Sequence, residues 1–275
     1  MESEAVTERF ARLAGLPDEQ IELAPAALWM ATIEHPRLDA GEHIAALDTL
    51  AESAVRRLAG WQDPQSSINA LSEFLFDEMG FRGNRDDYYD PRNSLLNVVL
   101  SRRLGIPITL SLVYIEVGAR LGIGLIGIGM PGHFLVRHAD LADVFIDPFY
   151  GGKVLSTEEC AQRLRQVTGT PVRWSPAYLS PVSNAEFIAR MLRNLKATYW
   201  RRQDYDRALR VTNWLMALQP AAAQERRDRG LLYAQTGRHV LALNDLEQYI
   251  SSKPSTRDAA QAQKLVRELK RSVAN

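Results

Sequence analysis

The chain has 275 residues, which leaves room for one large domain or two of ordinary size. Apolar residues make up 46% and charged residues 24%, a composition typical of globular proteins rather than disordered, fibrous or membrane ones. Basic and acidic residues number 33 each, so no whole-chain field favours nucleic acid or an anionic lipid surface. The single cysteine, Cys160, excludes an intramolecular disulfide and any cysteine-rich metal site.

The N-terminus and the most apolar stretch bear on where the protein is found. The opening Met-Glu-Ser-Glu is acidic and lacks the apolar core of a signal peptide. Residues 106–130 are the most apolar part of the chain, but Glu116 and Arg120 interrupt them, so we expect no membrane span and no membrane partner. A lone thiol fits a reducing compartment. We expect a cytoplasmic protein.

Helices are predicted for the first part of the chain, because apolar residues recur there at steps of three and four. The predicted helices cover residues 44–58, 63–80, 93–103 and 108–121. The second has clear ends, since Asp63 can cap it, Pro64 suits a first turn and Gly80 can take the left-handed closing position.

Beyond Gly122 the hydrophobic period changes from that of a helix to that of a strand. Residues 132–138 and 143–147 look like an antiparallel strand pair joined by a short turn. Ser156-Thr-Glu-Glu159 then forms a capping box that opens another helix, and Gly169 can close it.

His133 and Asp147 are the first candidate site residues, because the predicted strand pair can bring them together. A turn centred on Asp140 places His133 opposite Asp147, and it pairs Arg137 with Asp143, a favourable match of charge. The carboxylate can then hold the imidazole in one tautomer, as a nucleophile–base–orienter site requires. A purely structural His–Asp hydrogen bond is an equally good interpretation of these two residues alone.

A nucleophile for this pair is harder to find. Cys160 lies in a later helix beside Glu158 and Glu159, whose charges oppose thiolate formation. Thr109 and Ser111 lie near the start of the helix that follows Pro107, where a helix N-terminus stabilises developing negative charge. Hydroxyls at such positions usually only cap the helix.

The last third of the chain repeats with a period of 34 residues. Aligning the segment with itself at an offset of 34 residues matches Tyr199 with Tyr233, Ala208 with Ala242, Leu209 with Leu243 and Pro220 with Pro254. These positions suit helical hairpins in which small residues allow close contact and proline ends the second helix, so the segment resembles two tetratricopeptide repeats, 189–222 and 223–256, with a capping helix over 257–273.

Several longer motifs carry a family resemblance. They are Tyr88-Tyr-Asp-Pro-Arg-Asn-Ser-Leu-Leu-Asn97, Arg103-Leu-Gly-Ile-Pro-Ile-Thr-Leu-Ser111, Pro131-Gly-His-Phe-Leu-Val136, Ile146-Asp-Pro-Phe149 with Gly151-Gly152, and Arg190-Met-Leu-Arg-Asn-Leu-Lys196. Together they resemble the bacterial SirB-type proteins, which join a transglutaminase-like core to C-terminal tetratricopeptide repeats. The resemblance covers about residues 10–256.

The resemblance implies a site of the papain type, with a cysteine at a helix N-terminus followed by histidine and aspartate on successive strands. His133 and Asp147 match the histidine and the aspartate. The cysteine should lie near Pro107 to Thr109, and none is there. The implied site has therefore lost its nucleophile, and Asn93 and Asn97 are expected to line its pocket.

We expect a mostly helical α+β fold in three parts. Residues 1–168 form a transglutaminase-like domain of the papain-like superfold with a small antiparallel sheet, and residues 183–275 form an all-α repeat domain. The proline-rich segment 169–182 connects them, because proline resists both helix and central strand. No cofactor and no metal is expected, since His138 points to the other strand face from His133.

The favoured function is a non-catalytic, cytoplasmic protein-binding or regulatory module. Residues 183–275 carry 17 basic and 9 acidic side chains, so their partner is expected to be an acidic protein or peptide, contacted through Arg190, Arg193 and Lys196. Those charges could equally form a solvated face, or they could dock onto the first domain, in which acidic residues outnumber basic ones.

The alternative function is a hydrolase or acyltransferase in which Thr109 or Ser111 attacks and His133 is the base. A third is that the first domain only supports the repeats. Direct nucleic-acid binding is not expected.

Overall fold

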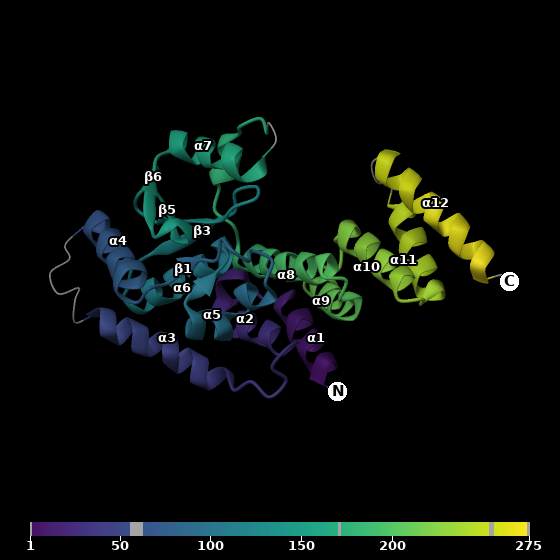
Figure 1. The fold of residues 1–275 in the computed structure, drawn as a ribbon, viewed down its shortest axis with the longest axis horizontal. Coiled ribbons are helices and arrows are strands. Elements are labelled where there is room, and N and C mark those ends of the chain that lie inside the picture. Colours follow the sequence, from purple (N-terminus) through teal and green to yellow (C-terminus); the bar gives the residue numbers. More distant parts are fainter. Residues whose placement is uncertain (1, 56–62, 170–171, 253–255, 274–275) are drawn as a thin grey trace. The chain divides into compact units, whose positions relative to one another are not determined.

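The computed structural model describes residues 2–55, 63–169, 172–252 and 256–273 (Figure 1). The chain divides into two compact units. One consists of Asp18–Met191, and the other combines Met1–Pro17 with Leu192–Asn275. The predicted boundaries at residues 168 and 183 stay a prediction about how the chain divides into domains.

The unit of Asp18–Met191 is built around one buried helix. This helix, α6 (Pro107–Arg120), has almost every side chain from Pro107 to Gly118 buried, and it begins at a proline whose missing N–H costs nothing in a first turn. The other helices of the unit are α2 (Leu23–Ala31), α3 (Ala40–Val55), α4 (Pro64–Ser72), the π-helix η2 (Glu73–Glu78), α5 (Leu96–Arg102), α7 (Thr157–Thr168) and the start of α8 (Asn184–Arg201). Short 3-10 turns lie at η1 (Asp18–Gln20), η3 (Pro91–Ser94), η4 (Pro148–Tyr150) and η5 (Pro176–Leu179).

The capping signals in the sequence mark helix ends in the structure. The Asp63 side chain accepts a hydrogen bond from the Ser66 N–H at 2.9 Å, and the Ser156–Glu159 capping box opens α7 as predicted. Gly80 and Gly169 both have left-handed backbones, with φ of 73° and 62°. Residues 56–58, the end of the first predicted helix, lie outside the described residues.

A small antiparallel sheet stands beside these helices. Its four strands run in the order β3 (Leu125–Ile128), β4 (Leu135–His138), β5 (Phe145–Asp147) and β6 (Lys153–Leu155). Helix α7 covers one face, because Cys160 and Leu164 pack with side chains from β4, β5 and β6. Helix α6 packs against β3 and β4. A second, parallel pair joins β1 (Arg82–Gly83) to β2 (Leu104–Gly105).

The predicted register of the central strand pair is wrong by two residues. Val136 pairs with Ile146 and Arg137 with Phe145, so Arg137 is not opposite Asp143. The guanidinium of Arg137 instead donates to the Ala142 carbonyl at 3.3 Å. A cross-strand charge match contributes only about 0.2–1 kcal/mol, too little to fix the register by itself. A shift of two preserves the face on which each side chain lies.

The second unit contains the predicted repeats and an additional helix from the N-terminus. Its helices are α1 (Glu2–Leu13), the end of α8 (Asn184–Arg201), α9 (Tyr205–Leu218), α10 (Ala223–Gln235), α11 (His239–Ser251) and α12 (Thr256–Val273). Helix α11 begins 34 residues after α9, as the repeat predicts. Ala208 and Ala242 are both fully buried, and a Cβ at Gly230 would lie 2.8 Å from Leu246. Pro254 lies outside the described residues.

Helix α1 packs against α9, which the sequence does not indicate. The rings of Phe10 and Trp214 lie 5.8 Å apart, and both side chains are buried. The overall class, a mostly helical α+β domain followed by repeat helices, is confirmed.

Candidate functional site

His133 and Asp147 form a buried pair. The Nε2 atom of His133 lies 2.9 Å from each carboxylate oxygen of Asp147, and 2% and 0% of the two side chains are exposed. The predicted contact is therefore present, although the predicted register is not. Because residues two apart on a strand share a face, Asp147 lies on the same side of β5 as Phe145, the side that α7 covers.

Helix α7 supplies a cation to this pair. The Nε atom of Arg163 lies 3.2 Å from the Oδ2 atom of Asp147, so the buried carboxylate is shared between an imidazole and a guanidinium. The same guanidinium lies 3.6 Å from the centre of the Tyr150 ring. The centres of the Tyr150 and His133 rings lie 5.9 Å apart. A buried charge needs such a partner, because desolvation otherwise makes the ionised form costly.

The loop that carries His133 is held by a second arginine. The Nη2 atom of Arg190, on α8, donates to the main-chain carbonyls of Met130 and His133, the latter at 2.6 Å. The guanidinium also lies 5.4 Å from the centre of the Phe134 ring. Arg190 thereby positions the histidine loop within its own unit. Whether it also contacts a partner stays a prediction.

Thr109, one of the two predicted hydroxyl nucleophiles, is occupied at the start of α6. Its Oγ1 atom donates to the Asn93 carbonyl at 2.7 Å and accepts from the Ile106 N–H at 3.1 Å. The side chain is fully buried. This is the geometry of a helix cap.

Asn93 belongs to the same network as Thr109. Its side chain accepts from Asn84 at 3.0 Å and donates to the Asp87 carbonyl at 2.7 Å, so it fixes the turn before α5.

Two other predicted site residues have buried polar atoms without a partner. The Ser111 hydroxyl makes no hydrogen bond and the Asn97 Oδ1 atom accepts none, and both side chains are at least nine-tenths buried. Among the described residues no hydrogen bond joins Thr109 or Ser111 to His133. The structure brings together His133 with Asp147 and Asn93 with Thr109, as two separate networks.

Cys160 is buried in α7 and poorly suited to nucleophilic chemistry. Burial raises the pKa of its thiol, and the carboxylates of Asp147 and Glu159 add to the shift, to about 12. A nucleophilic cysteine needs a lowered pKa, because the thiolate is the reactive form.

Arg193 and Lys196 are engaged inside the repeat unit. Arg193 pairs with Glu225 at 2.9 Å, while Lys196 lies 2.6 Å from both Glu225 and Asp228. Lys196 is 7% exposed and Glu225 4%, so this is a buried ion-pair cluster between α8 and α10. The partner-binding role of these two residues stays a prediction.

Arg163 and Tyr150 are site residues that the sequence analysis missed. Arg163 contacts Asp147 from α7, and Tyr150 contacts His133 from the turn that follows β5. Tyr150 lies inside the motif that runs from Ile146 to Gly152, but its residue type alone did not mark it as a site residue. The cap of α7 was a usable signal for Arg163, since it places that residue one turn after Cys160 on the helix face that meets the sheet.

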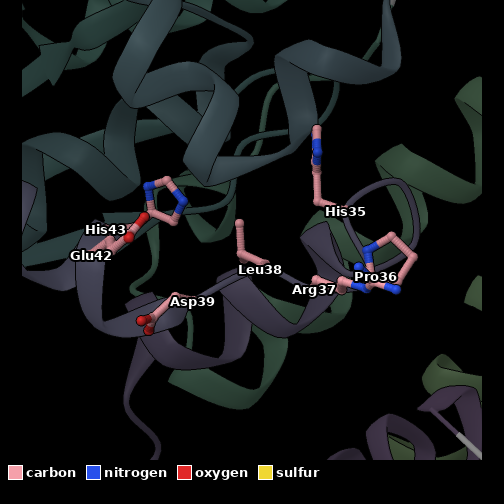
Figure 2. A pocket seen from close by; sticks show the side chains of 7 residues that line it. All are labelled: His35, Pro36, Arg37, Leu38, Asp39, Glu42 and His43. Atoms are coloured by element: carbon pink, nitrogen blue, oxygen red, sulfur yellow. The ribbon is translucent and has the colours of Figure 1, made fainter.

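A hollow of about 500 Å³ lies elsewhere in the same unit, on the connection between α2 and α3. Figure 2 shows Leu38 between the rings of His35 and His43, with Glu42 beside His43. In the part of the chain that the structure describes, no three histidine, cysteine or carboxylate side chains converge as metal ligands would. No described helix is both long enough and apolar enough to span a bilayer.

The comparisons with known proteins define the class. Residues 42–193 match the transglutaminase-like superfamily, and residues 195–267 match the tetratricopeptide repeat. The chain is thus a transglutaminase-like domain joined to tetratricopeptide repeats. No solved structure matches it.

Individual relatives then give the family. A UPF0162 protein of Xylella fastidiosa is 41% identical over 252 residues, which are 89% of this chain and 88% of that one. A UPF0162 protein of Vibrio cholerae is 31% identical over 76% of this chain and 78% of its own length. The chain belongs to this bacterial UPF0162 family, the SirB-type proteins. A shorter stretch, 36% of this chain, is 38% identical to 17% of F-box only protein 21 of Mus musculus.

Proposed function

We propose that the protein is a regulatory protein-binding module whose transglutaminase-like domain keeps the imidazole–carboxylate pair but transfers no acyl group. The observation that carries the proposal is the start of α6, where the superfamily nucleophile is expected. Thr109 there uses its hydroxyl to cap the helix and to hold Asn93. A hydroxyl becomes nucleophilic only when a base within hydrogen-bond reach takes its proton, and this one donates to a carbonyl instead.

The alternative is a hydrolase or acyltransferase with Thr109 or Ser111 as nucleophile and His133 as base. Two observations favour it. The contact between His133 and Asp147 is the orientation that such a base needs, and the Ser111 hydroxyl has no hydrogen-bond partner. The two proposals share one folded structure, and they differ in whether the hydroxyl of Thr109 or Ser111 is reactive.

Reactivity is tested by labelling the full chain with fluorophosphonate and acyl probes. We expect the wild-type chain to be labelled no more than His133→Ala. His138→Ala is the control for loss of another buried histidine. Labelling that disappears in His133→Ala and in Ser111→Ala, but persists in His138→Ala, would establish the alternative.

Binding is tested on the repeat unit. Repeat helices generally serve as binding surfaces, and α11 begins with two exposed apolar side chains, Val240 and Leu241, at 69% and 47% exposure. Leu241→Glu should abolish capture of a cross-linked partner from bacterial lysate. Val55→Glu, at an equally exposed apolar residue of the other unit, should leave capture intact. Equal capture by both variants would contradict this placement of the binding surface.

A further inference from the structure

The strand β1 and the turn η4 border an open cavity of about 400 Å³ that the proposed function does not use. It is lined by residues 82–86 and 149–151 together with Leu104. Tyr150, one of its walls, is also in ring contact with His133. We propose that this cavity binds the carboxylate of a ligand, through Arg82 and Arg85.

The walls of the cavity are held firmly in place. Asn84 is 7% exposed, donates to the Asn93 side chain at 3.0 Å and accepts from the Asp87 N–H at 3.1 Å. A Cβ at Gly83 would lie 2.6 Å from both the ring and the carbonyl oxygen of Phe149, so β1 runs directly against that residue. Such a preformed concave site loses little entropy when a ligand binds.

The charges that line the cavity do not cancel. Two basic residues, Arg82 and Arg85, line it against one acidic residue, Asp86. Across the described chain no ion pair joins either arginine to a carboxylate, whereas Arg163 nearby is already paired with Asp147. The lining thus has one positive charge in excess, which suits a monoanion.

Arg85 is held in a geometry that leaves its hydrogen-bond donors available. Its guanidinium carbon lies 4.4 Å from the centre of the Tyr150 ring. A guanidinium stacked on an aromatic face keeps its N–H groups in the plane around its edge, where they can bind a carboxylate in bidentate fashion. A phosphate dianion would bring a second charge close to Asp86, so the carboxylate is the better match.

The hollow around His35 provides a natural contrast within the same unit. It also contains an arginine, Arg37, but two carboxylates, Asp39 and Glu42, accompany it. The excess charge there is negative, so the same chemistry predicts no carboxylate binding. Arg37 therefore serves as the matched control for Arg85.

The test is an NMR titration of the full chain in 0.15 M salt. The probes are acetyl-Gly-Glu-Gly-amide, its Gln counterpart, butyrate and inorganic phosphate. The Glu peptide should bind at least tenfold more tightly than the Gln peptide, and Arg85→Gln should weaken it at least tenfold, as loss of a charge-assisted hydrogen bond predicts. Asp86→Asn should tighten it severalfold, and Arg37→Gln should change nothing.

The outcomes distinguish two kinds of ligand from each other, and both of them from failure of the inference. Tighter binding of the peptide than of butyrate indicates an acidic peptide segment, and equal binding indicates a free carboxylic acid. An unchanged affinity in Arg85→Gln, an equal loss in Arg37→Gln, or phosphate binding as tight as that of the Glu peptide would overturn the inference. None of these readouts depends on acyl transfer or on capture by the repeats, so this inference and the proposed function can fail separately.

Discussion

The Nε2 atom of His133 lies 2.9 Å from each carboxylate oxygen of Asp147, so this imidazole nitrogen is already occupied. With Asp147 ionised, Nε2 donates its proton to the carboxylate, and a neutral ring then has its lone pair on Nδ1. The shared ion pair of Asp147 with Arg163 keeps that carboxylate in place. The pair thus has the arrangement of an oriented imidazole, and within the described residues no hydrogen bond joins this ring to a hydroxyl or a thiol.

Cys160 should resist alkylation in the folded protein. Burial and two neighbouring carboxylates raise the pKa of its thiol to about 12, so at pH 8 only about one thiol in ten thousand is ionised. We expect negligible iodoacetamide labelling of the native chain at pH 8, and complete labelling in urea, by mass spectrometry. Stoichiometric labelling without unfolding would show that the thiol is accessible and ionised.

Asp90 should make stability depend on acid pH. Burial alone would raise the pKa of its carboxyl, but hydrogen bonds from Arg92 and the charges of Arg92 and Arg102 outweigh burial and lower it. A lowered folded-state pKa adds stability above the unfolded value of about 3.9, and this stability is lost as the pH falls through the folded value.

The variant Asp90→Asn should accordingly lose about 2 kcal/mol of unfolding free energy at pH 7. Its difference from the wild type should shrink as the pH falls below about 4. Denaturant unfolding across this pH range measures both, and the exposed Asp143→Asn is the control. A difference that does not change with pH would contradict the electrostatic origin.

Arg190 should stabilise the loop before β4. In Arg190→Leu the carbonyls of Met130 and His133 lose the charged guanidinium donor, which should cost about 2 kcal/mol of unfolding free energy. The His133 amide, which donates to the Met130 carbonyl at 3.1 Å, should exchange its hydrogen faster. Arg165→Leu, at an exposed residue of α7, should alter neither. Unchanged exchange at His133 would show that the loop is held by other contacts.

The buried pair of Lys196 and Glu225 should show strong coupling. Lys196→Met removes one of the two cations paired with Glu225, a carboxylate only 4% exposed, and leaves Arg193 as its partner, so we expect a loss of about 2 kcal/mol. The double variant Lys196→Met/Glu225→Leu should recover part of that loss, because the buried carboxylate that lost one of its cations is gone. A double-mutant cycle in denaturant measures the coupling. Losses that simply add would mean that the two residues act independently.

Local chemistry made several elements predictable. The capping box at Ser156 and the cap at Asp63 act within a few residues, so the sequence alone locates the starts of α7 and α4. The contact between His133 and Asp147 was predictable for a different reason. A register error of two residues leaves every side chain on its correct face, so the contact survives although the pairing of Arg137 was wrong.

Contacts between distant residues were not predictable. Arg163 reaches Asp147 from the next helix, and Arg190 reaches Met130 across 60 positions, with no periodicity to mark either contact. The basic residues at the start of the repeats illustrate the same limit. Their spacing shows that they share a helix face, but only the structure shows that Lys196 is buried against acids from α10.

The packing of Phe10 on Trp214 has a consequence for synthesis of the chain. Helix α1 leaves the ribosome about 200 residues before its neighbour α9, a delay of roughly 10–40 s at ordinary elongation rates. Throughout that interval the apolar face of α1 has no native partner from the repeats. Until α9 has been made, this apolar face stays exposed, and transiently exposed apolar surface of this kind promotes aggregation of a nascent chain.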